Sequence, residues 1–461
     1  MLFNSIEYLI FLPTVFLLYW FVFQKNLRVQ NLLLLISSYV FYGWWDYRFL
    51  SLIFLSTVVD YCVGLKIYNS SDKKTKKSYL WVSILFNLGL LGFFKYFNFF
   101  IDSWIDLLGA IGYEQQSTWT LNVILPIGIS FYTFQTMSYS LDIYYGKLKP
   151  TKDFISFASF VSFFPQLVAG PIERASNLLP QILNERELIL KNILRGTSLI
   201  IYGFFMKIIV ADNLSLISNS VFSNGDLKNT SLEVLVGIYA FAFQIYGDFN
   251  GYSSIAIGTA YLFGFNLMTN FKLPYFSESP SDFWKRWHVS LSSWLRDYLY
   301  ISLGGNRYGT LLTYRNLMLT MILGGLWHGA AWNFVFWGVF HGFILCVYKL
   351  ISLKNFIKSK IFRVLIMFHL TCISWVLFRC ESISHIFHIF HKLLSNFSIS
   401  DHGIGSLALL LFFTLPLLIF ELLVYNKIDN KKINFTFFLY IILMLLFFSP
   451  VTSNEFIYFQ F

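Results

Sequence analysis

Long apolar stretches recur along this 461-residue sequence and restrict its fold more than any other feature. Windows of roughly 18–22 apolar residues match the length that an α-helix needs to cross a bilayer. The chain is 56% hydrophobic and only 13% charged, whereas soluble domains carry about 25% charged residues. Transmembrane β-strands would alternate in segments of about ten residues, and these stretches do not alternate. The sequence therefore predicts an all-α polytopic membrane protein.

The apolar stretches predict about eleven to thirteen membrane spans in one domain that occupies residues 1–461. Residues 153–172 are expected to be re-entrant and residues 276–303 interfacial. Irregular backbone at membrane depth is tolerated only where protein shields it or where it lines a cavity. We therefore expect these two segments to surround a central funnel. The expected spans are 4–23, 30–45, 46–68, 79–100, 121–141, 196–211, 232–247, 252–268, 311–326, 329–350, 361–380, 405–425 and 434–450.

Clusters of lysine and arginine predict the orientation of the chain, because these residues are enriched in cytoplasmic loops. The same clusters account for the net charge of +10 better than nucleic-acid binding does. They alternate consistently with the spans only if the N-terminus is extracytoplasmic, and the tail 451–461 is then extracytoplasmic as well. The clusters are Lys25 and Arg28; Lys73, Lys74, Lys76 and Lys77; Lys147, Lys149 and Lys152; Lys349, Lys354, Lys358 and Lys360; and Lys427, Lys431 and Lys432.

Two polar motifs interrupt the apolar pattern, and each contains a histidine. One runs from Asp282 to His288, and the other runs from Gly324 to Ala330 and contains His328. Ionisable groups at membrane depth cost several kcal/mol, so a function is the default hypothesis for them. A neutral imidazole, with an ordinary pKa of about 6.5, is suited to accept a proton near neutral pH. These two histidines are candidates for acid–base chemistry, and the alternative for each is a hydrogen-bonded position in the core.

Histidine in a membrane protein also serves metal binding and proton-coupled transport. A metal site needs three or four converging ligands, and the regularly spaced His385, His388 and His391 are expected to form a solvated helix face instead. No metal is therefore expected. His341 is expected to be a packing residue. A proton-coupled transporter would place acidic residues within spans and show inverted repeats. The acids within the expected spans are few and no repeat is recognised, but this alternative stays open at this point.

Four segments together resemble the membrane-bound O-acyltransferase family, most closely its bacterial branch that acetylates alginate or peptidoglycan. The similarity follows the order of the segments and extends over most of residues 1–461. Asn250 is a departure, since many relatives are expected to have serine there. The segments read Phe164-Pro165-Gln166-Leu167-Val168-Ala169-Gly170-Pro171-Ile172, Gln244-Ile245-Tyr246-Gly247-Asp248-Phe249-Asn250-Gly251-Tyr252-Ser253, Ser281-Asp282-Phe283-Trp284-Lys285-Arg286-Trp287-His288-Val289-Ser290-Leu291 with Trp294-Leu295-Arg296-Asp297-Tyr298-Leu299-Tyr300, and Gly325-Leu326-Trp327-His328-Gly329-Ala330.

The resemblance implies a membrane O-acetyltransferase in which His328 is the principal catalytic residue and His288 is its partner. It implies acetyl-CoA as the cytoplasmic acyl donor, whose phosphates would be attracted by basic residues. The residues expected to bind donor or substrate are Trp327, Asn333, Asp248, Lys285, Arg286, Trp287 and Arg296.

The tail 451–461 is similar to C-terminal tails of these acetyltransferases and of a small partner in teichoic-acid D-alanylation. The resemblance implies Tyr458 as a covalent acyl carrier, whereas composition alone favours an interfacial aromatic belt. Eleven extended residues reach at most ~36 Å, and half of the hydrocarbon core is about 15 Å, so the tail is long enough to fold back to the middle of the membrane.

A phenol, with a pKa of about 10, is a leaving group comparable to a thiol, so its acetyl ester can pass the acetyl group on. Because the phenol is mostly protonated at pH 7, it needs a base before it can attack the donor.

The predicted reaction moves acetyl across the bacterial cytoplasmic (inner) membrane to an extracytoplasmic SGNH-type esterase-like partner that O-acetylates a polysaccharide. This chain contains no Gly-Asp-Ser nucleophile block of its own. Richness in Phe, Ile, Asn and Lys indicates an AT-rich genome, which argues against an alginate-producing organism. Peptidoglycan is therefore favoured over alginate as the acceptor. The alternative within the enzyme class is D-alanyl transfer of the teichoic-acid type. Membrane lipids, and no nucleic acid, are the other expected partners.

Overall fold

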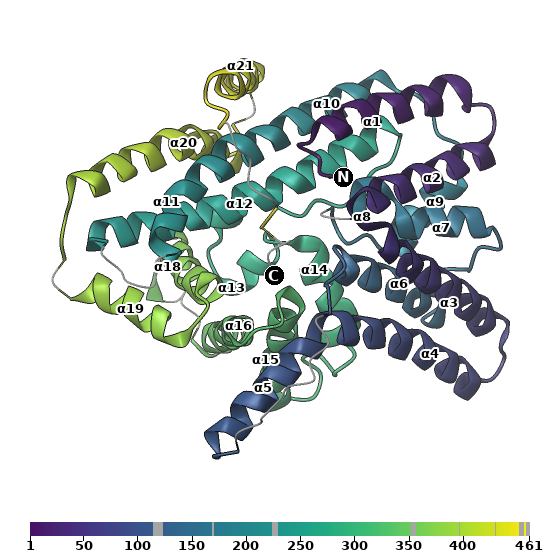
Figure 1. Cartoon of the computed structure of the whole chain (residues 1–461), viewed down its shortest axis with the longest axis horizontal. Helices are drawn as coiled ribbons and strands as arrows, with labels where there is room; N and C mark the ends of the chain where they lie inside the picture. Colours follow the sequence, from purple (N-terminus) through teal and green to yellow (C-terminus); the bar gives the residue numbers. More distant parts are fainter. Residues whose placement is uncertain are drawn as a thin grey trace. The chain divides into compact units, whose positions relative to one another are not determined.

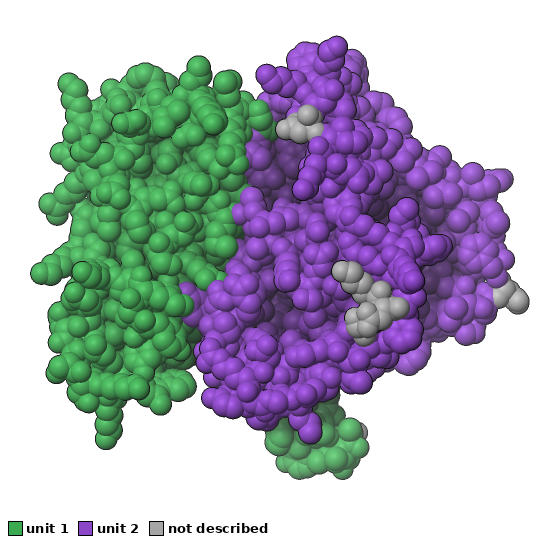
Figure 2. All heavy atoms as spheres, turned by 180° about the vertical axis from the view of Figure 1, so that it is seen from behind, with its two compact units in different colours: residues 1–198, 256–268 green, residues 199–255, 269–461 purple. Residues whose placement is uncertain are grey.

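The computed structural model describes residues 1–113, 123–167, 170–223, 229–351, 356–395, 397–428, 430–450 and 456–457, and all regular secondary structure in these ranges is helical. Figure 1 labels the helices of the chain, and Figure 2 shows its two compact units in different colours. Unit 1 comprises residues 1–198 and 256–268, and unit 2 comprises residues 199–255 and 269–461. The predicted all-α fold is confirmed.

Unit 1 contains helices α1 to α9, and α10 and α12 each belong to both units. The helices of unit 1 are α1 (Ile6–Leu17), η1 (Leu18–Val22), α2 (Leu27–Asp46), η2 (Tyr47–Phe49), α3 (Leu50–Asn69), α4 (Lys73–Leu91), η3 (Gly92–Tyr96), α5 (Phe97–Ala110), α6 (Ile129–Tyr144), α7 (Phe154–Ser162), α8 (Phe164–Leu167) and α9 (Ala175–Leu183). The two shared helices are α10 (Leu190–Phe204) and α12 (Ser231–Leu262).

Unit 2 continues with a set of short helices and then with long ones. These helices are η4 (Phe205–Asp212), α11 (Asn213–Phe222), η5 (Pro274–Phe276), α13 (Pro280–Trp284), α14 (Val289–Trp294), η6 (Leu295–Tyr300), α15 (Thr310–His328), α16 (Trp332–Leu350), α18 (Lys360–Arg379), α19 (Ile383–Leu394), α20 (Asp401–Tyr425) and α21 (Lys431–Phe447). The short elements between 274 and 300 coincide with the segment predicted to be interfacial.

Seven helical stretches among the described residues are long and apolar enough to cross a membrane by length and composition. They confirm the multi-pass membrane character of the chain. The longest, Leu27–Asn69, joins α2, η2 and α3, so the seven stretches do not by themselves give the number of crossings. The predicted eleven to thirteen spans and their orientation therefore stay predictions.

Residues 153–172 form short buried helices rather than one span. Helix α7 ends at Ser162 and α8 begins at Phe164, whose backbone N–H donates to the Ser38 hydroxyl at 3.0 Å. The Ser38 hydroxyl thus accepts a hydrogen bond from a backbone N–H that has no helical partner at the break between α7 and α8. Buried backbone groups need such a partner. The described part of this segment, 153–167 and 170–172, thus has the irregular backbone that its prolines and glycine predicted.

Unit 1 also holds a buried carboxylate between three of its helices. Asp60 on α3 accepts hydrogen bonds from Asn87 on α4 and Ser140 on α6, each at 2.7 Å, and another from Ser83. Buried charged or polar groups are stable only when hydrogen-bonded or paired. These bonds explain how an acidic side chain is accommodated in a helix of membrane-spanning length.

One predicted pair of spans is wrong. Residues 232–247 and 252–268 were expected to form separate helices, but α12 is continuous over Ser231–Leu262. The reason lies in Gly247, where an added Cβ would lie 2.8 Å from the backbone oxygen of Met206 in η4. Glycine here permits close helix contact and does not end the helix.

A second glycine contact positions the loop after α15. An added Cβ at Gly325 would lie 2.2 Å from the backbone oxygen of Phe334 on α16. We expect Gly325→Ala to lower the free energy of unfolding by about 1–3 kcal/mol, because packed backbones must separate, with a corresponding fall in the thermal unfolding midpoint. The control is Gly89→Ala in α4, where an added Cβ meets nothing within 4 Å. That variant should be neutral or slightly stabilised, and an equal loss in both would refute the steric explanation.

Candidate active site

His328 is the last residue of α15 and lies buried between α15 and α16. The helix ends there because the backbone of Gly329 is extended, with φ −157° and ψ 152°. The Phe334 ring packs against Gly329, and its nearest atom lies 2.0 Å from where a Cβ of residue 329 would be. The His328 side chain is 3% exposed. Its imidazole contacts Trp337 with ring centres 5.1 Å apart and Phe378 with ring centres 5.7 Å apart.

His288 caps the N-terminus of α14 in a left-handed backbone conformation, with φ 42°. Such a conformation in a non-glycine residue costs of order 1–3 kcal/mol and is concentrated at functional sites. His288 Nδ1 lies 3.5 Å from the Ser290 hydroxyl, which donates to Asn270 Oδ1 at 2.7 Å. Asn270 in turn donates to Ser253 on α12 at 2.9 Å. Serine and asparagine thus fix the position of the imidazole.

Burial lowers the pKa of His288 to about 3. Desolvation disfavours the charged form of a base, so this imidazole is neutral at pH 7. His288 lies outside the seven stretches of membrane-spanning length. A neutral ring presents one donor nitrogen and one acceptor nitrogen.

The two histidines that were predicted as a pair lie in one site. Their ring centres are 6.2 Å apart. Both rings contact Trp327, at 5.8 Å from His288 and 5.1 Å from His328. The Phe249 ring of α12 covers His288 at 4.6 Å. The walls around both imidazoles are therefore largely aromatic, which excludes water and strengthens electrostatic effects inside.

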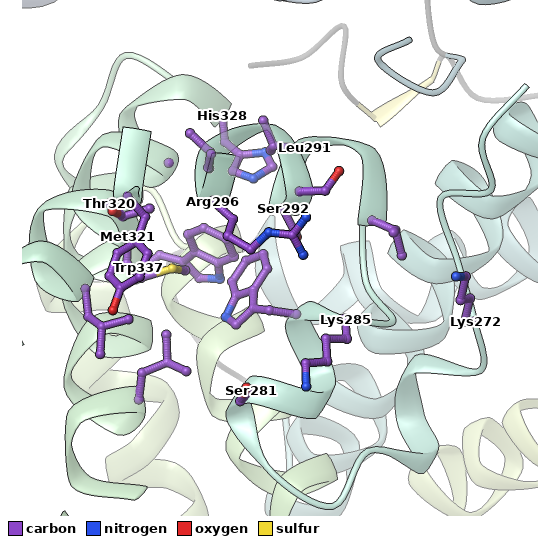
Figure 3. A pocket seen from close by; sticks show the side chains of 18 residues that line it. Lys272, Ser281, Lys285, Leu291, Ser292, Arg296, Thr320, Met321, His328 and Trp337 are labelled. Atoms are coloured by element: carbon purple, nitrogen blue, oxygen red, sulfur yellow. The ribbon is translucent and has the colours of Figure 1, made fainter. Parts of the chain in front are cut away.

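His328 also lines a cavity of about 550 Å³ within unit 2 (Figure 3). Three cations, Lys272, Lys285 and Arg296, line the same cavity and are exposed to solvent. The remaining walls are mostly apolar or aromatic. The other lining residues are Ser281, Trp284, Val289, Leu291, Ser292, Ser293, Leu295, Tyr300, Leu317, Thr320, Met321, Gly324, Trp337 and Leu345. The cavity thus joins exposed positive charge to a buried imidazole.

Two residues of the C-terminal tail are described, and both pack onto α12. Phe456 is completely buried against Tyr252, with ring centres 4.3 Å apart, and Phe249 lies 6.0 Å away. The backbone N–H of Ile457 donates to Asp248 Oδ2 at 2.6 Å. Tyr458, the predicted carrier, lies outside the described residues.

Residues 74–387 match the model of MBOAT, the membrane-bound O-acyltransferase family. The chain belongs to this family. The protein named "Probable alginate O-acetylase AlgI" of Azotobacter vinelandii is 40% identical to it over 432 residues, covering 92% of this chain and 85% of that protein. The peptidoglycan O-acetyltransferase of Helicobacter pylori is 37% identical, covering 83% of this chain and 78% of that protein.

A more distant relative is the teichoic acid D-alanyltransferase of Bacillus subtilis, which is 29% identical over 57% of this chain and 71% of that protein. The chain is therefore a multi-pass membrane acyltransferase, and the predicted family and enzyme class are confirmed. The transporter alternative loses its support.

The structure brings together only part of the residues that were predicted to bind donor or substrate in this acyltransferase. Lys285 and Arg296 line the cavity, and Trp327 contacts both histidines. Arg286 points elsewhere: its Nε pairs with Asp282 Oδ1 at 2.9 Å. Neighbours in the sequence thus differ in role because successive side chains of a helix or turn face different directions.

The other three predicted binding residues have structural partners in unit 2. Trp287 is buried, with ring centres 4.8 Å from Trp375 and 4.9 Å from Phe271. Asn333 donates to the backbone oxygen of Phe378 at 3.0 Å. Asp248 is ion-paired with Lys207 at 2.8 Å. None of the three is among the residues that line the described cavity.

The remaining histidines of unit 2 have packing or surface positions. His341 is fully buried beside Trp337 and Trp284, with ring centres 4.6 and 5.0 Å away. His388 and His391 are exposed on α19. Among the described residues, no group of three or more His, Cys, Asp or Glu side chains has the geometry to hold a metal ion.

Sequence reasoning missed Lys207, which lies in η4 within the helical stretch Leu190–Phe222. An ionisable residue at such a position was a usable signal, since intramembrane charges mark pairs or pathways. It also missed Asn270 and Ser290, which support His288. No local pattern distinguishes these two from ordinary polar residues.

Proposed function

We propose that this acyltransferase moves acetyl groups from acetyl-CoA on the cytoplasmic side of the bacterial inner membrane to Tyr458, and from there to an extracytoplasmic partner. The partner, of the SGNH esterase-like type, would then O-acetylate an exported or cell-wall polysaccharide. One observation carries this proposal more than any other. His328 lines the same cavity as the exposed cations Lys272, Lys285 and Arg296.

The arrangement of the cavity suits a donor that is anionic at one end and a thioester at the other. Exposed cations attract phosphates while they remain largely hydrated, so the desolvation free energy that opposes binding stays small. The apolar walls suit the pantetheine arm and the acetyl group. The thioester would lie against the buried His328.

The proposed step uses His328 as the general base. His328 accepts the phenol proton of Tyr458, the phenolate oxygen attacks the thioester carbonyl, and a C–O bond forms as the C–S bond breaks. The thiolate of the donor leaves and takes up the proton that His328 accepted, which returns the imidazole to its neutral form. A tyrosyl ester retains much of the transfer potential of a thioester, because phenols and thiols have comparable pKa values.

Support for the tail as carrier comes from the two described residues beside it. Phe456 packs on Tyr252 and lies 6.0 Å from Phe249, and Phe249 contacts His288. Tyr458 itself lies outside the described residues, and its role stays a proposal.

The acceptor polysaccharide is proposed at the level of class. The relatives are named for alginate and for peptidoglycan, so their names do not decide between the two. Peptidoglycan remains our prediction from composition. The D-alanyl alternative rests on a relative of lower identity and lower coverage.

We expect Lys285→Ala to raise the KM for acetyl-CoA about tenfold and to leave kcat nearly unchanged, because a charge-assisted contact to a phosphate is lost while the reacting atoms are untouched. Release of free thiol by the purified protein together with its extracytoplasmic partner and the polysaccharide, at a series of acetyl-CoA concentrations, measures both constants. Lys349→Ala, an exposed lysine in the last turn of α16, is the control. An unchanged KM in Lys285→Ala would argue against the donor position.

Thiol release also tests the donor itself. Wild-type protein should release thiol from acetyl-CoA and transfer the acetyl group to its tail. Transfer from a D-alanyl carrier protein with no release from acetyl-CoA would instead support the D-alanyl alternative.

A further inference from the structure

We propose that the buried triad of Lys207, Asp212 and Asp248 is a binding site for the C-terminal segment of this same chain. In this role the triad and the aromatic rings beside it hold residues 456–457, so that the next residue is presented to the histidine site. The identity of that next residue as the acyl carrier rests on the proposed function, but occupancy of the site does not.

The triad has one more acidic than basic group. Lys207 Nζ lies 2.8 Å from Asp212 Oδ1 and 2.8 Å from Asp248 Oδ1. All three side chains are at most 4% exposed. Buried carboxylate oxygens require hydrogen-bond donors or cations, and Lys207 serves one oxygen of each aspartate.

The tail provides such a donor. The backbone N–H of Ile457 donates to the second oxygen of Asp248 at 2.6 Å. Hydrogen bonds to an ionised carboxylate are about twice as strong as neutral ones. Because the donor is backbone, the contact selects the position of the chain and not the side chain of residue 457.

An aromatic surface beside the triad completes the site. The rings of Tyr252 and Phe249 on α12 receive Phe456, which is completely buried. Positions 248 and 252 are one helical turn apart and therefore share a face of α12. The ammonium group of Lys207 also lies 5.7 Å from the Tyr252 ring centre, within the range of a cation–π contact.

The same surface connects the tail to the reaction site. The ring centre of Phe249 lies 6.0 Å from that of Phe456 and 4.6 Å from that of His288. Consecutive Cα atoms are about 3.8 Å apart. When Ile457 is held, residue 458 can reach only positions close to it. The reacting residue is then kept near the histidine site and does not have to find it from the end of a free tail. Asp248 is a positioning residue in this view, not a donor-binding one.

The backbone contact gives a direct test. Ile457→Pro removes the N–H that Asp248 accepts, whereas Ile457→Ala keeps it and shortens only the side chain. In full-length purified protein incubated with acetyl-CoA, we expect Ile457→Pro to slow acetylation of the tail about 10- to 100-fold, the factor that a charge-assisted hydrogen bond represents. We expect a loss of only a few-fold for Ile457→Ala. Equal rates in the two variants, in a protein whose wild type acetylates its tail, would overturn the proposal.

A second measurement reports occupancy without chemistry. In full-length Ile457→Cys protein, the rate of thiol labelling at position 457, read from the mass of the C-terminal peptide, should be slow because this position is 4% exposed. Adding Asp248→Asn should raise that rate about tenfold or more. Adding Asp60→Asn, which neutralises a buried carboxylate on α3 in unit 1, should not. Lys207 keeps Asp212 as its partner in Asp248→Asn, and an asparagine at position 60 can still accept a hydrogen bond from Ser140, so both variants are expected to fold.

The outcomes separate this proposal from the proposed function. Fast labelling without Asp248→Asn, or the same labelling with and without it, would refute the binding site. Slow labelling that Asp248→Asn releases, in a protein whose Tyr458→Phe variant still transfers acetyl normally, would support the binding site and refute the tyrosyl carrier.

Discussion

His328→Ala is expected to lower the rate of acetyl transfer by roughly 10²–10⁴, the contribution of a general base. The imidazole is buried against Trp337 and Phe378 and also lines the cavity that carries the exposed cations. It is therefore the side chain of the cavity that is able to accept a proton at its buried end. Thiol release from acetyl-CoA by purified protein, at saturating donor, measures the loss.

Two comparisons make the His328→Ala result interpretable. His388→Ala removes an exposed histidine from α19 and should retain full activity. The thermal unfolding midpoint of His328→Ala shows whether the truncation has also damaged the fold, because removal of a buried side chain leaves a cavity. A folded His328→Ala protein with normal transfer would refute the assignment of this histidine as the base.

Tyr458→Phe is expected to abolish the covalent acetyl group on the tail and, in cells, the O-acetylation of the polysaccharide. The change removes one hydroxyl and leaves the aromatic ring, so it separates a carrier role from an anchoring role. The mass of the C-terminal peptide after incubation with acetyl-CoA gives the result: wild type should gain one acetyl group, and Tyr458→Phe and His328→Ala should gain none.

The control for the tyrosine is Tyr47→Phe, which removes the hydroxyl of an exposed side chain in η2. It should acetylate its tail at the wild-type rate. Normal acetylation of the polymer by cells that carry only Tyr458→Phe would show that the tail is an anchor and that acetyl reaches the partner by another route.

The sequence alone determined the class of the fold. Apolar stretches of bilayer length require helices, because a backbone in lipid must satisfy its hydrogen bonds within each segment. This requirement acts locally, so length and composition were enough to predict it. The motifs around His288 and His328 were likewise readable from the chain, and the structure places both imidazoles beside Trp327.

The sequence was less informative about the direction in which a side chain points and about which elements lie close together. Lys285 and Arg286 are adjacent, yet Lys285 lines the cavity while Arg286 pairs with Asp282. Residues 232–247 and 252–268 were predicted as two separate spans, but Gly247 lets the continuous α12 lie close to η4. In both cases the neighbouring element, absent from the local pattern, decided the outcome.

Only the tertiary structure decided what Asp248 does. Its partners are Lys207 and the backbone of Ile457, the latter 209 positions away in the sequence. A backbone N–H has no signature in the sequence, and contacts between distant segments follow from the packing of all the helices between them. The type of each element is thus set by local physics, whereas the roles of individual charges are set by which distant groups the fold places within hydrogen-bonding distance.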